Sequence, residues 1–362
     1  MKTLRLTKAV DAAALLKQDE VVALPTETVY GLAGNATNPE TVKKIFTAKE
    51  RPSFDPLIVH ISEKTLHHSS PVKALVIENI LSSDVLSWKN LGKIESVMKH
   101  FWPGPLTIIL PKGSKIPAEV TSNQPTVGIR CPKHPLFQEV LAHISFPLAA
   151  PSANRFGRIS PTNADHVITE LDGRISGVLD GGNCEVGVES TIVQITEDSV
   201  TLLRPGKISK SELEVAFGTT VATAPSLMQK ISESAVAPGM LDEHYAPRKP
   251  LYLIPVSFQD SKAISIVSSF PESSLESSAW ISMSGFHHSF QNLEKQEVRI
   301  LSHENSYEEM ARNLFSTMRE LDENPKITHI FADVPENTKE GLGASIFDRL
   351  KRASRNKPIQ TN

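Results

Sequence analysis

Short apolar runs alternate with amphipathic segments along the first 218 residues of this chain. The runs predict buried strands at residues 21–24, 57–61, 106–110, 126–130 and 147–150. Helical spacing follows Asn38 and Pro39, which suit a helix N-cap and first position, and it recurs at 135–143 and 163–171. Segments 191–195 and 200–203 flank a polar turn and predict a hairpin. A mixed α/β domain is therefore expected.

The pattern changes between residues 218 and 250, where Ala, Ser, Thr and Pro dominate. Apolar runs then return at 251–256, 264–267, 279–283, 298–301 and 327–334, and they alternate with helical stretches such as 307–321. This order predicts a small, largely parallel sheet with flanking helices. We expect a first domain at 1–218, an interdomain linker at 219–250 and a smaller α/β domain at 251–362.

Charge and cysteine content narrow the class of protein. The chain has 38 Lys and Arg against 41 Asp and Glu, and its net charge of −3 provides no overall basic field for nucleic acid. Cys131 and Cys184 are too few for a disulfide framework or a four-cysteine zinc site, which suits a reducing cytosol. No uncharged run reaches transmembrane length. A cytoplasmic protein without membrane contact is expected.

Two polar clusters lie next to predicted strands. Thr26, Glu27 and Thr28 follow the strand at 21–24, where open α/β sheets commonly bind ligands, although the segment also fits an ordinary polar turn. Lys49 and Arg51 end the first helix and are followed by two prolines. Fixed cations suit a polyphosphate, but an isolated pair can also serve only the helix dipole. His60, on the next strand, fits either a ligand site or a core position.

Further candidates lie at other strand and helix ends. Arg130 closes an apolar strand and can pair with a carboxylate, or it can form a surface ion pair of little energy. Ser160 precedes a predicted helix, whose free N–H groups attract phosphate. The other short polar loops are residues 149–154, 181–182, 189–191 and 204–206. No G-x-x-x-x-G-K-[ST] segment occurs, so an ATP site would not be a Walker loop.

Together these motifs resemble the YrdC-like domain of the L-threonylcarbamoyladenylate synthase family. The matching segments are Pro25-Thr-Glu-Thr-Val-Tyr-Gly, Lys49-x-Arg51-Pro52, Pro151-Ser-Ala-Asn and Glu189-Ser-Thr-Ile, within about residues 5–215. The long form of the family is resembled by Pro238-Gly-Met, His244-Tyr-Ala-Pro, Gly341-Leu-Gly-Ala and Asp348-Arg-Leu. The resemblance implies a YrdC-like domain with a twisted sheet and a smaller Rossmann-like C-terminal domain.

The resemblance also implies an activity and its residues. The family makes threonylcarbamoyl-AMP and pyrophosphate from L-threonine, bicarbonate or CO2, and ATP with Mg2+, and a separate transferase complex passes the product to an adenosine beside the tRNA anticodon. Lys49 and Arg51 would act on the phosphates as catalytic cations. Threonine would contact Thr28, His60, Arg130 and Ala150. ATP would contact Arg51, Asp55, Thr126, Ser152, Ser160, Ser190, Arg204 and Tyr245. No residue is implied as a metal ligand, and direct tRNA binding stays open.

Two features modify this expectation. The family commonly has Asn where this chain has Asp55, so a carboxylate stands where ATP is expected. Pairing with Lys49 or Arg51, or a hydrogen bond from the nucleotide, is favoured over a contact with Mg2+. The motif-rich linker segment 238–247 is expected to lie across the cleft of the first domain, with Tyr245 on the nucleotide.

Two other classes of protein remain as alternatives. A noncatalytic RNA-binding module could use the same cations, but the sequence has neither overall basicity nor an aromatic stacking series. A carbamoyl-transfer domain like those of hydrogenase-maturation proteins would have the same fold. Those proteins carry zinc-finger and acylphosphatase-like modules, for which this chain has no counterpart.

Overall fold

The computed structural model describes residues 2–224, 244–255, 277–284, 297–334 and 339–354. Contacts divide the chain into two units. The first comprises Met1–Phe156, Ser160–Glu185 and Glu189–Met240, and the second comprises Gly157–Ile159, Val186–Val188 and Leu241–Asn362. Two short internal segments, 157–159 and 186–188, thus group with the C-terminal part of the chain.

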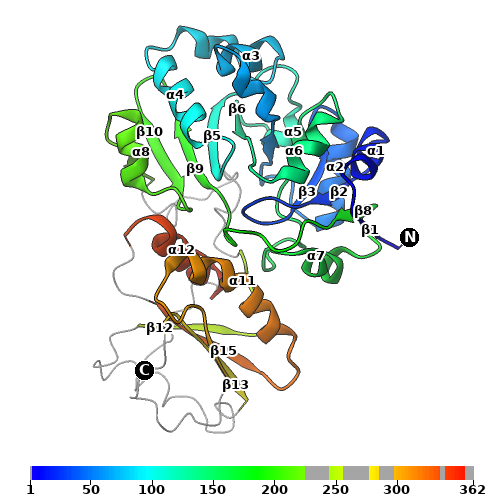
Figure 1. Ribbon diagram of the computed structural model, residues 1–362, viewed down its shortest axis with the longest axis vertical. Coiled ribbons are helices and arrows are strands. Elements are labelled where there is room, and N and C mark those ends of the chain that lie inside the picture. The colour runs from blue at the N-terminus through cyan, green and yellow to red at the C-terminus, as the bar shows by residue number, and fades with distance from the viewer. Residues whose placement is uncertain (1, 225–243, 256–276, 285–296, 335–338, 355–362) are drawn as a thin grey trace. The chain divides into compact units, whose positions relative to one another are not determined.

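An eleven-stranded mixed sheet organises the first unit, in the order β1-β8-β2-β3-β7-β4-β6-β5-β9-β10-β11 (Figure 1). Its strands are β1 (Leu4–Leu6), β2 (Val22–Leu24), β3 (Gly31–Asn35), β4 (Ile58–His60), β5 (Leu106–Pro111), β6 (Thr126–Arg130), β7 (Leu148–Ala149), β8 (Gly177–Leu179), β9 (Thr191–Ile195), β10 (Val200–Arg204) and β11 (Ala222–Thr223). All the strands predicted here are present, and β9 and β10 pair antiparallel as the predicted hairpin. The mixed α/β fold class is confirmed.

Helices cover both faces of this sheet (Figure 1). They are α1 (Ala9–Lys17), α2 (Pro39–Lys49), α3 (Pro71–Ile77), α4 (Leu91–Phe101), α5 (Ala118–Thr121), α6 (Pro135–Ala142), α7 (Ala164–Leu171) and α8 (Lys210–Phe217), with 3₁₀ turns η1 (Glu63–His67) and η2 (Ser83–Ser87). The N-cap predicted at Asn38 is confirmed, since its side chain accepts a hydrogen bond from Glu40 N at 2.9 Å. The hairpin β2–β3 was not predicted, because the segment Gly31–Asn35 contains no β-branched residue.

The second unit contains a separate parallel sheet in the order β12-β15-β13-β14. Its elements are β12 (Leu251–Pro255), β13 (Ser278–Ser282), β14 (Glu297–Ile300), β15 (His329–Val334), α11 (Tyr307–Glu323) and α12 (Gly341–Ala353). The predicted parallel α/β arrangement is therefore confirmed. The predicted strand at 264–267 and most of the predicted linker lie outside the described residues. No described helix is long and apolar enough to cross a bilayer.

Gly187 explains how segment 186–188 joins the second unit. It has φ of +81°, and a Cβ built on it would lie 2.4 Å from Ala311 O in α11. Only glycine allows both this backbone conformation and this close approach.

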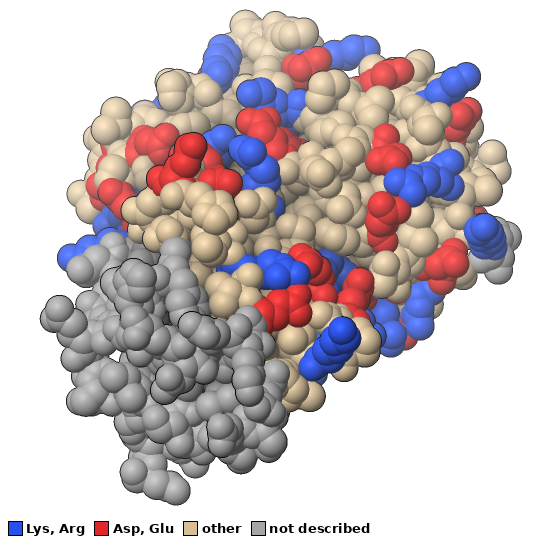
Figure 2. Space-filling view, turned by 60° about the horizontal axis from the view of Figure 1, so that its bottom comes forward, with Lys and Arg blue, Asp and Glu red and all other residues tan. Residues whose placement is uncertain are grey.

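On the surface, Figure 2 shows basic and acidic side chains interspersed over the described residues of the face drawn.

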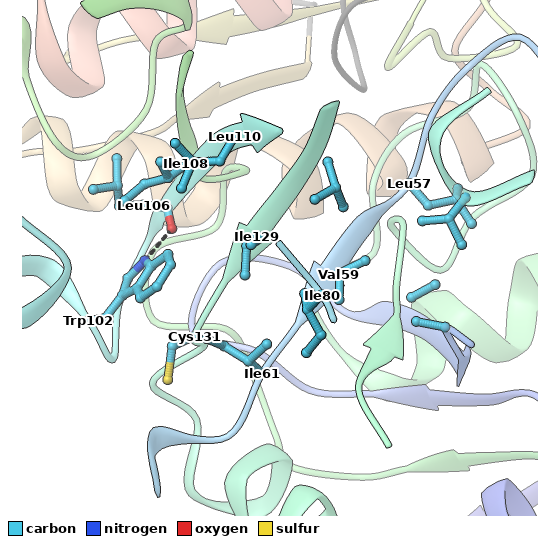
Figure 3. Packing of buried hydrophobic residues seen from close by; sticks show 14 of the residues in the cluster. Leu57, Val59, Ile61, Ile80, Trp102, Leu106, Ile108, Leu110, Ile129 and Cys131 are labelled. Atoms are coloured by element: carbon cyan, nitrogen blue, oxygen red, sulfur yellow. Dashed lines mark hydrogen bonds between the residues drawn. The ribbon is translucent and has the colours of Figure 1, made fainter. Parts of the chain in front are cut away.

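Alternation along the central strands separates the core from the opposite face of the sheet. Val59 of β4, Ile108 of β5 and Ile129 of β6 point into the main core, where Trp102 Nε1 donates to Leu106 O at 2.7 Å (Figure 3). The intervening residues Ile58 and Ile109, with Ile192 of β9, form a separate small cluster. Because side chains alternate with a period of two, the residues between core positions face the other side of the sheet.

Candidate functional site

A small pocket lies on the face of the sheet opposite the main core, within the first unit. About 310 Å³ of space free of protein atoms lies among its lining residues, and this volume includes open solvent. Apolar residues from four strands and hydroxyls from strands and neighbouring segments meet in its lining: Pro56, Leu57, Ile58, Thr107, Ile109, Thr121, Gln124, Thr126, Val127, Gly128 and Ile192. An apolar surface bordered by a few hydroxyls is the usual composition of a small-molecule site.

Buried cations surround one buried carboxylate beside this pocket. Arg51 Nη2 lies 2.9 Å from Asp55 Oδ2, and the two side chains are only 2% and 0% exposed. The same nitrogen donates to the carbonyl of Pro56, a pocket residue, at 2.8 Å. Burial raises the pKa of Asp55, while the positive charges of Arg51, Lys49 and Arg204 oppose that rise. Local pairing of Asp55 is thus present in the structure.

The end of α2 places these cations. Glu50 takes a left-handed conformation with φ of 54°, and Arg51 N donates back to Phe46 O at 3.0 Å, which turns the chain toward the sheet. Lys49 is fully buried, and its ammonium donates to the carbonyls of Ser152 and Asn154. Burial, followed by the charge of Arg51, holds the pKa of Lys49 well below its usual range. Lys49 therefore fastens the loop containing Ser152 to α2.

Hydroxyls and a further arginine border the other side of the pocket. Thr107, which lines the pocket, lies 2.8 Å from the hydroxyl of Ser190, and Arg204 Nη2 donates to that hydroxyl at 3.1 Å. Ser160 donates to Glu189 Oε1 at 2.5 Å, one residue before Ser190. The structure thus gathers Arg51, Asp55, Thr126, Ser190 and Arg204 around one pocket, with Ser160 and Ser152 in adjoining loops.

The residues expected to contact threonine lie along the same face of the sheet. His60 and Arg130 are register partners on β4 and β6, and His60 also pairs with Leu148 of β7. Ala150 N donates to Ile58 O at 3.1 Å, which keeps the end of β7 against β4. Arg130 has the same parity on β6 as Thr126, so both face away from the main core. Sequence-distant residues thus converge at adjacent strand ends.

His60 is a neutral group at ordinary pH. It is 2% exposed, Nδ1 lies 3.2 Å from Ile58 O, and its ring lies 5.3 Å from that of Phe137. Burial, followed by the charge of Arg130, lowers the pKa of His60 to about 3. A neutral imidazole can exchange hydrogen bonds with a ligand but adds no charge.

Sequence reasoning missed the role of one carboxylate, Glu27. Its Oε1 lies 2.8 Å from Arg130 Nη2, and both side chains are 5% exposed. Thr28, expected to contact threonine, is fully buried beside it, with its hydroxyl 2.8 Å from that of Thr26. The available signal was that Glu27 is the only charged residue between positions 21 and 39.

Tyr245 belongs to the second unit. It is fully buried, stacks on Phe315 with ring centroids 5.5 Å apart, and lies under the guanidinium of Arg349 at 5.6 Å. His244 packs against it edge-on at 4.2 Å. The backbone joins this packing, since Ala246 N donates to Gly157 O at 2.8 Å. The aromatic cluster anchors the described end of the predicted linker, while the nucleotide contact of Tyr245 stays a prediction.

The fold and this face of the sheet define a class: a mixed α/β protein equipped to hold an anionic ligand on its sheet. A family model described as telomere recombination matches residues 14–206, and one described as threonylcarbamoyl-AMP synthase, C-terminal domain, matches residues 208–355. The chain belongs to the threonylcarbamoyl-AMP synthase family.

Named relatives agree over nearly the whole chain. A threonylcarbamoyl-AMP synthase of Bacillus subtilis is 37% identical over 361 residues, covering 96% of this chain and 93% of the relative. One of Pyrococcus abyssi is 35% identical over 346 residues, covering 95% and 93%. The crystal structure of P. abyssi Sua5 complexed with L-threonine superposes with a TM-score of 0.83 at 31% identity, covering 100% of both chains. The expected family, two-part fold and enzyme class are confirmed.

Proposed function

We propose that this chain converts L-threonine, bicarbonate or CO2, and ATP into threonylcarbamoyl-AMP and pyrophosphate. The observation that carries the proposal is that Thr126 and Arg130 point to the same face of β6, with the pocket at one and a buried cation at the other. A separation of four residues along a strand spans about 13 Å, which suits a ligand with adenosine at one end and an amino acid at the other.

The reaction depends mainly on how the substrates are positioned and how their charge is neutralised. The threonine ammonium first releases a proton, and the neutral amine and bicarbonate then combine to a carbamate with loss of water. A carbamate oxygen then forms a bond to the α-phosphorus of ATP, and the bond from that phosphorus to the bridging oxygen breaks, releasing pyrophosphate. Because the carbamate is already an anion, no protein nucleophile is needed, and fixed cations that neutralise phosphate charge do most of the work.

Each cluster then has a part in this reaction. The adenosine moiety would occupy the pocket beside Thr126, with its phosphates toward Arg51, Ser190 and Arg204. Threonine would lie near Thr28, His60 and the backbone of Ala150, with its carboxylate on Arg130, since a guanidinium matches a carboxylate in shape and charge. The P. abyssi relative crystallised with L-threonine supports this substrate. Lys49 was expected to act on the phosphates as a second cation. Because its ammonium donates to the carbonyls of Ser152 and Asn154, we propose instead that it supports the phosphate site by holding that loop.

Magnesium would enter with ATP rather than sit in a site of the protein. Among the described residues no group of three His, Cys, Asp or Glu side chains could hold an ion, and Asp55 is already paired with Arg51. These residues do not fit a resident metal site, and we derive no step through one. The ion would accompany the phosphate oxygens of the substrate.

The product is a reactive mixed anhydride, so a second protein should consume it. We propose that a separate transferase complex passes the threonylcarbamoyl group to an adenosine beside the tRNA anticodon, and that both act in the cytoplasm. Closure of the linker over the nucleotide through Tyr245 would protect the anhydride from water. A second P. abyssi Sua5 structure carries alanine in place of a consecutive histidine and tyrosine. The only His-Tyr pair of this chain is His244-Tyr245.

Pyrophosphate release tests the proposal. Purified protein with ATP and Mg2+ should release pyrophosphate only when threonine and bicarbonate are both present. Equal release without threonine would refute the synthase activity. Tight binding of duplex RNA without turnover would favour an RNA-binding module, although Figure 2 shows basic side chains interspersed with acidic ones rather than a basic stripe on that face.

A further inference from the structure

Glu27 bridges two segments that are far apart in the sequence. It lies in the loop between β2 and β3, while its partners lie at the end of β6 and just beyond it. Oε1 is 2.8 Å from Arg130 Nη2, and Oε2 accepts a hydrogen bond from Lys133 N at 3.1 Å. One carboxylate therefore contacts both the side chain of Arg130 and the backbone N–H of Lys133.

The loop around Glu27 is itself held in one shape. The hydroxyl of Thr26 accepts hydrogen bonds from Thr28 N at 3.1 Å and Val29 N at 3.2 Å, and it lies 2.6 Å from Val29 O. These contacts define the backbone on both sides of Glu27. The carboxylate is consequently presented to Arg130 from a rigid turn.

The guanidinium of Arg130 is held in place, but within the described part of the chain one of its buried donors has no hydrogen bond of good geometry. Nε donates to Gly104 O at 3.3 Å, and Nη2 lies against Glu27. Within the described residues, neither Arg130 Nη2 nor Glu27 Oε1 makes a hydrogen bond of good geometry, although their charges are close. A buried donor in this state favours a ligand that supplies an acceptor.

We propose that Glu27 is a positioning residue that orients Arg130 for the carboxylate of the amino-acid substrate. This inference rests on the proposed function and extends its amino-acid site. Glu27 acts through Arg130 and does not touch the reacting atoms. Its charge attracts the guanidinium, whose Nε donates to Gly104 O, and it compensates a cation that would otherwise be buried without a counter-charge. Threonine then binds to a guanidinium that is already oriented, so its binding costs the protein little conformational entropy.

The test uses E27Q in the full-length protein, with E40Q as the matched control. Glu40 is an exposed carboxylate whose partner is Lys43, so its neutralisation should change nothing. E27Q keeps the size of the side chain and an acceptor for Lys133 N but loses the charge beside Arg130. The KM for threonine, and the Kd for threonine by calorimetry, should rise about tenfold, with the KM for ATP and the kcat at saturating threonine within about twofold of the unmodified protein.

A double-mutant cycle separates positioning from general damage. Because Glu27 acts through Arg130, E27Q should add little to the loss of threonine affinity already caused by R130A. A lowered kcat with unchanged KM and Kd for threonine, or additive losses in the two variants, would overturn the proposal. If E27Q does not fold, E27D decides: raised KM for threonine alone supports positioning, and unchanged kinetics refute it.

The two levels of inference fail differently. If pyrophosphate release by the unmodified protein does not depend on threonine, the proposed function itself is wrong. If release depends on threonine and E27Q behaves like E40Q in every constant, only the role of Glu27 is wrong.

Discussion

His60 and Arg130 are register partners on the parallel strands β4 and β6, both buried at the same edge of the sheet. The neutral imidazole and the guanidinium therefore stand side by side, and Glu27 rather than His60 balances the charge of Arg130. This arrangement allows a zwitterion to bind between a cation and uncharged hydrogen-bonding groups. It leads to separate expectations for the amino-acid and nucleotide ends of the site.

Arg51→Ala and Arg130→Ala should fail in different ways. Arg51 lies beside the pocket, so its loss should lower kcat/KM for ATP by about 100-fold through lost charge stabilisation. Arg130→Ala should chiefly raise the KM for threonine, also by about 100-fold, because the carboxylate of threonine loses the guanidinium that would bind it. Separate substrate titrations of pyrophosphate release measure both, and K43A, at an exposed site, is the control. The assignment of Arg130 is wrong if both variants lose only ATP affinity.

Asp55→Asn should keep activity and bind ATP as well as or better than the unmodified protein at fixed Mg2+. The substitution removes the anion beside Arg51 while preserving the shape of the side chain, so Arg51 keeps its backbone contacts at Asp55 O and Pro56 O. Titration of ATP at constant Mg2+ gives the result. A large loss of activity that extra Mg2+ restores would instead identify Asp55 as a metal ligand.

His60 should make the free energy of unfolding fall as the pH drops below about 6.5. In the unfolded chain the imidazole takes up a proton near that pH, whereas in the folded protein its pKa is lowered to about 3. Between these values the unfolded state binds more protons, so stability rises with pH, by at most about 1.4 kcal/mol per pH unit from this residue. Above pH 6.5 this contribution is complete.

Urea unfolding of the unmodified protein and H60N at pH 4.5 to 7.5 measures the effect (roughly the window set by these pKa values). The difference in unfolding free energy between the two proteins should shrink as the pH falls, since asparagine takes up no proton. Other titrating groups are common to both proteins and cancel. Parallel pH profiles would show that the pKa of His60 is not lowered in the folded protein.

A chain cut after residue 218 or, better, after Ala224 should fold but synthesise the adenylate poorly. The later cut keeps β11, which pairs with β10, and removes the linker with Tyr245. If the linker closes over the nucleotide, the truncated protein should lose activity or let its product hydrolyse faster. Circular dichroism checks the fold, and pyrophosphate release and product lifetime check the function. Unchanged activity and unchanged product lifetime would show that the linker only connects the two domains.

Local elements were largely predictable because their signals are local. The Asn38-Pro39 start of α2 and the apolar alternation of β6 depend on neighbouring residues, and the structure agrees with both. The hairpin β2–β3 was not foreseen, because Gly31–Asn35 is a strand only through its partners. At Gly34 a Cβ would lie 2.8 Å from Thr41 Cγ2 of α2, so the glycine reflects helix packing rather than strand propensity.

The sequence by itself determined the fold class, the family and the residue types of the site, because motifs such as Lys49-x-Arg51-Pro52 and Pro151-Ser-Ala-Asn are contiguous. Only the tertiary structure decided how these residues are paired. Asp55 joins Arg51, Lys49 joins the carbonyls of the loop at Ser152, and Glu27 joins Arg130 across more than 100 positions. The physical reason is that ion pairing and pKa depend on burial and on neighbours across strands, which no local pattern of residues specifies.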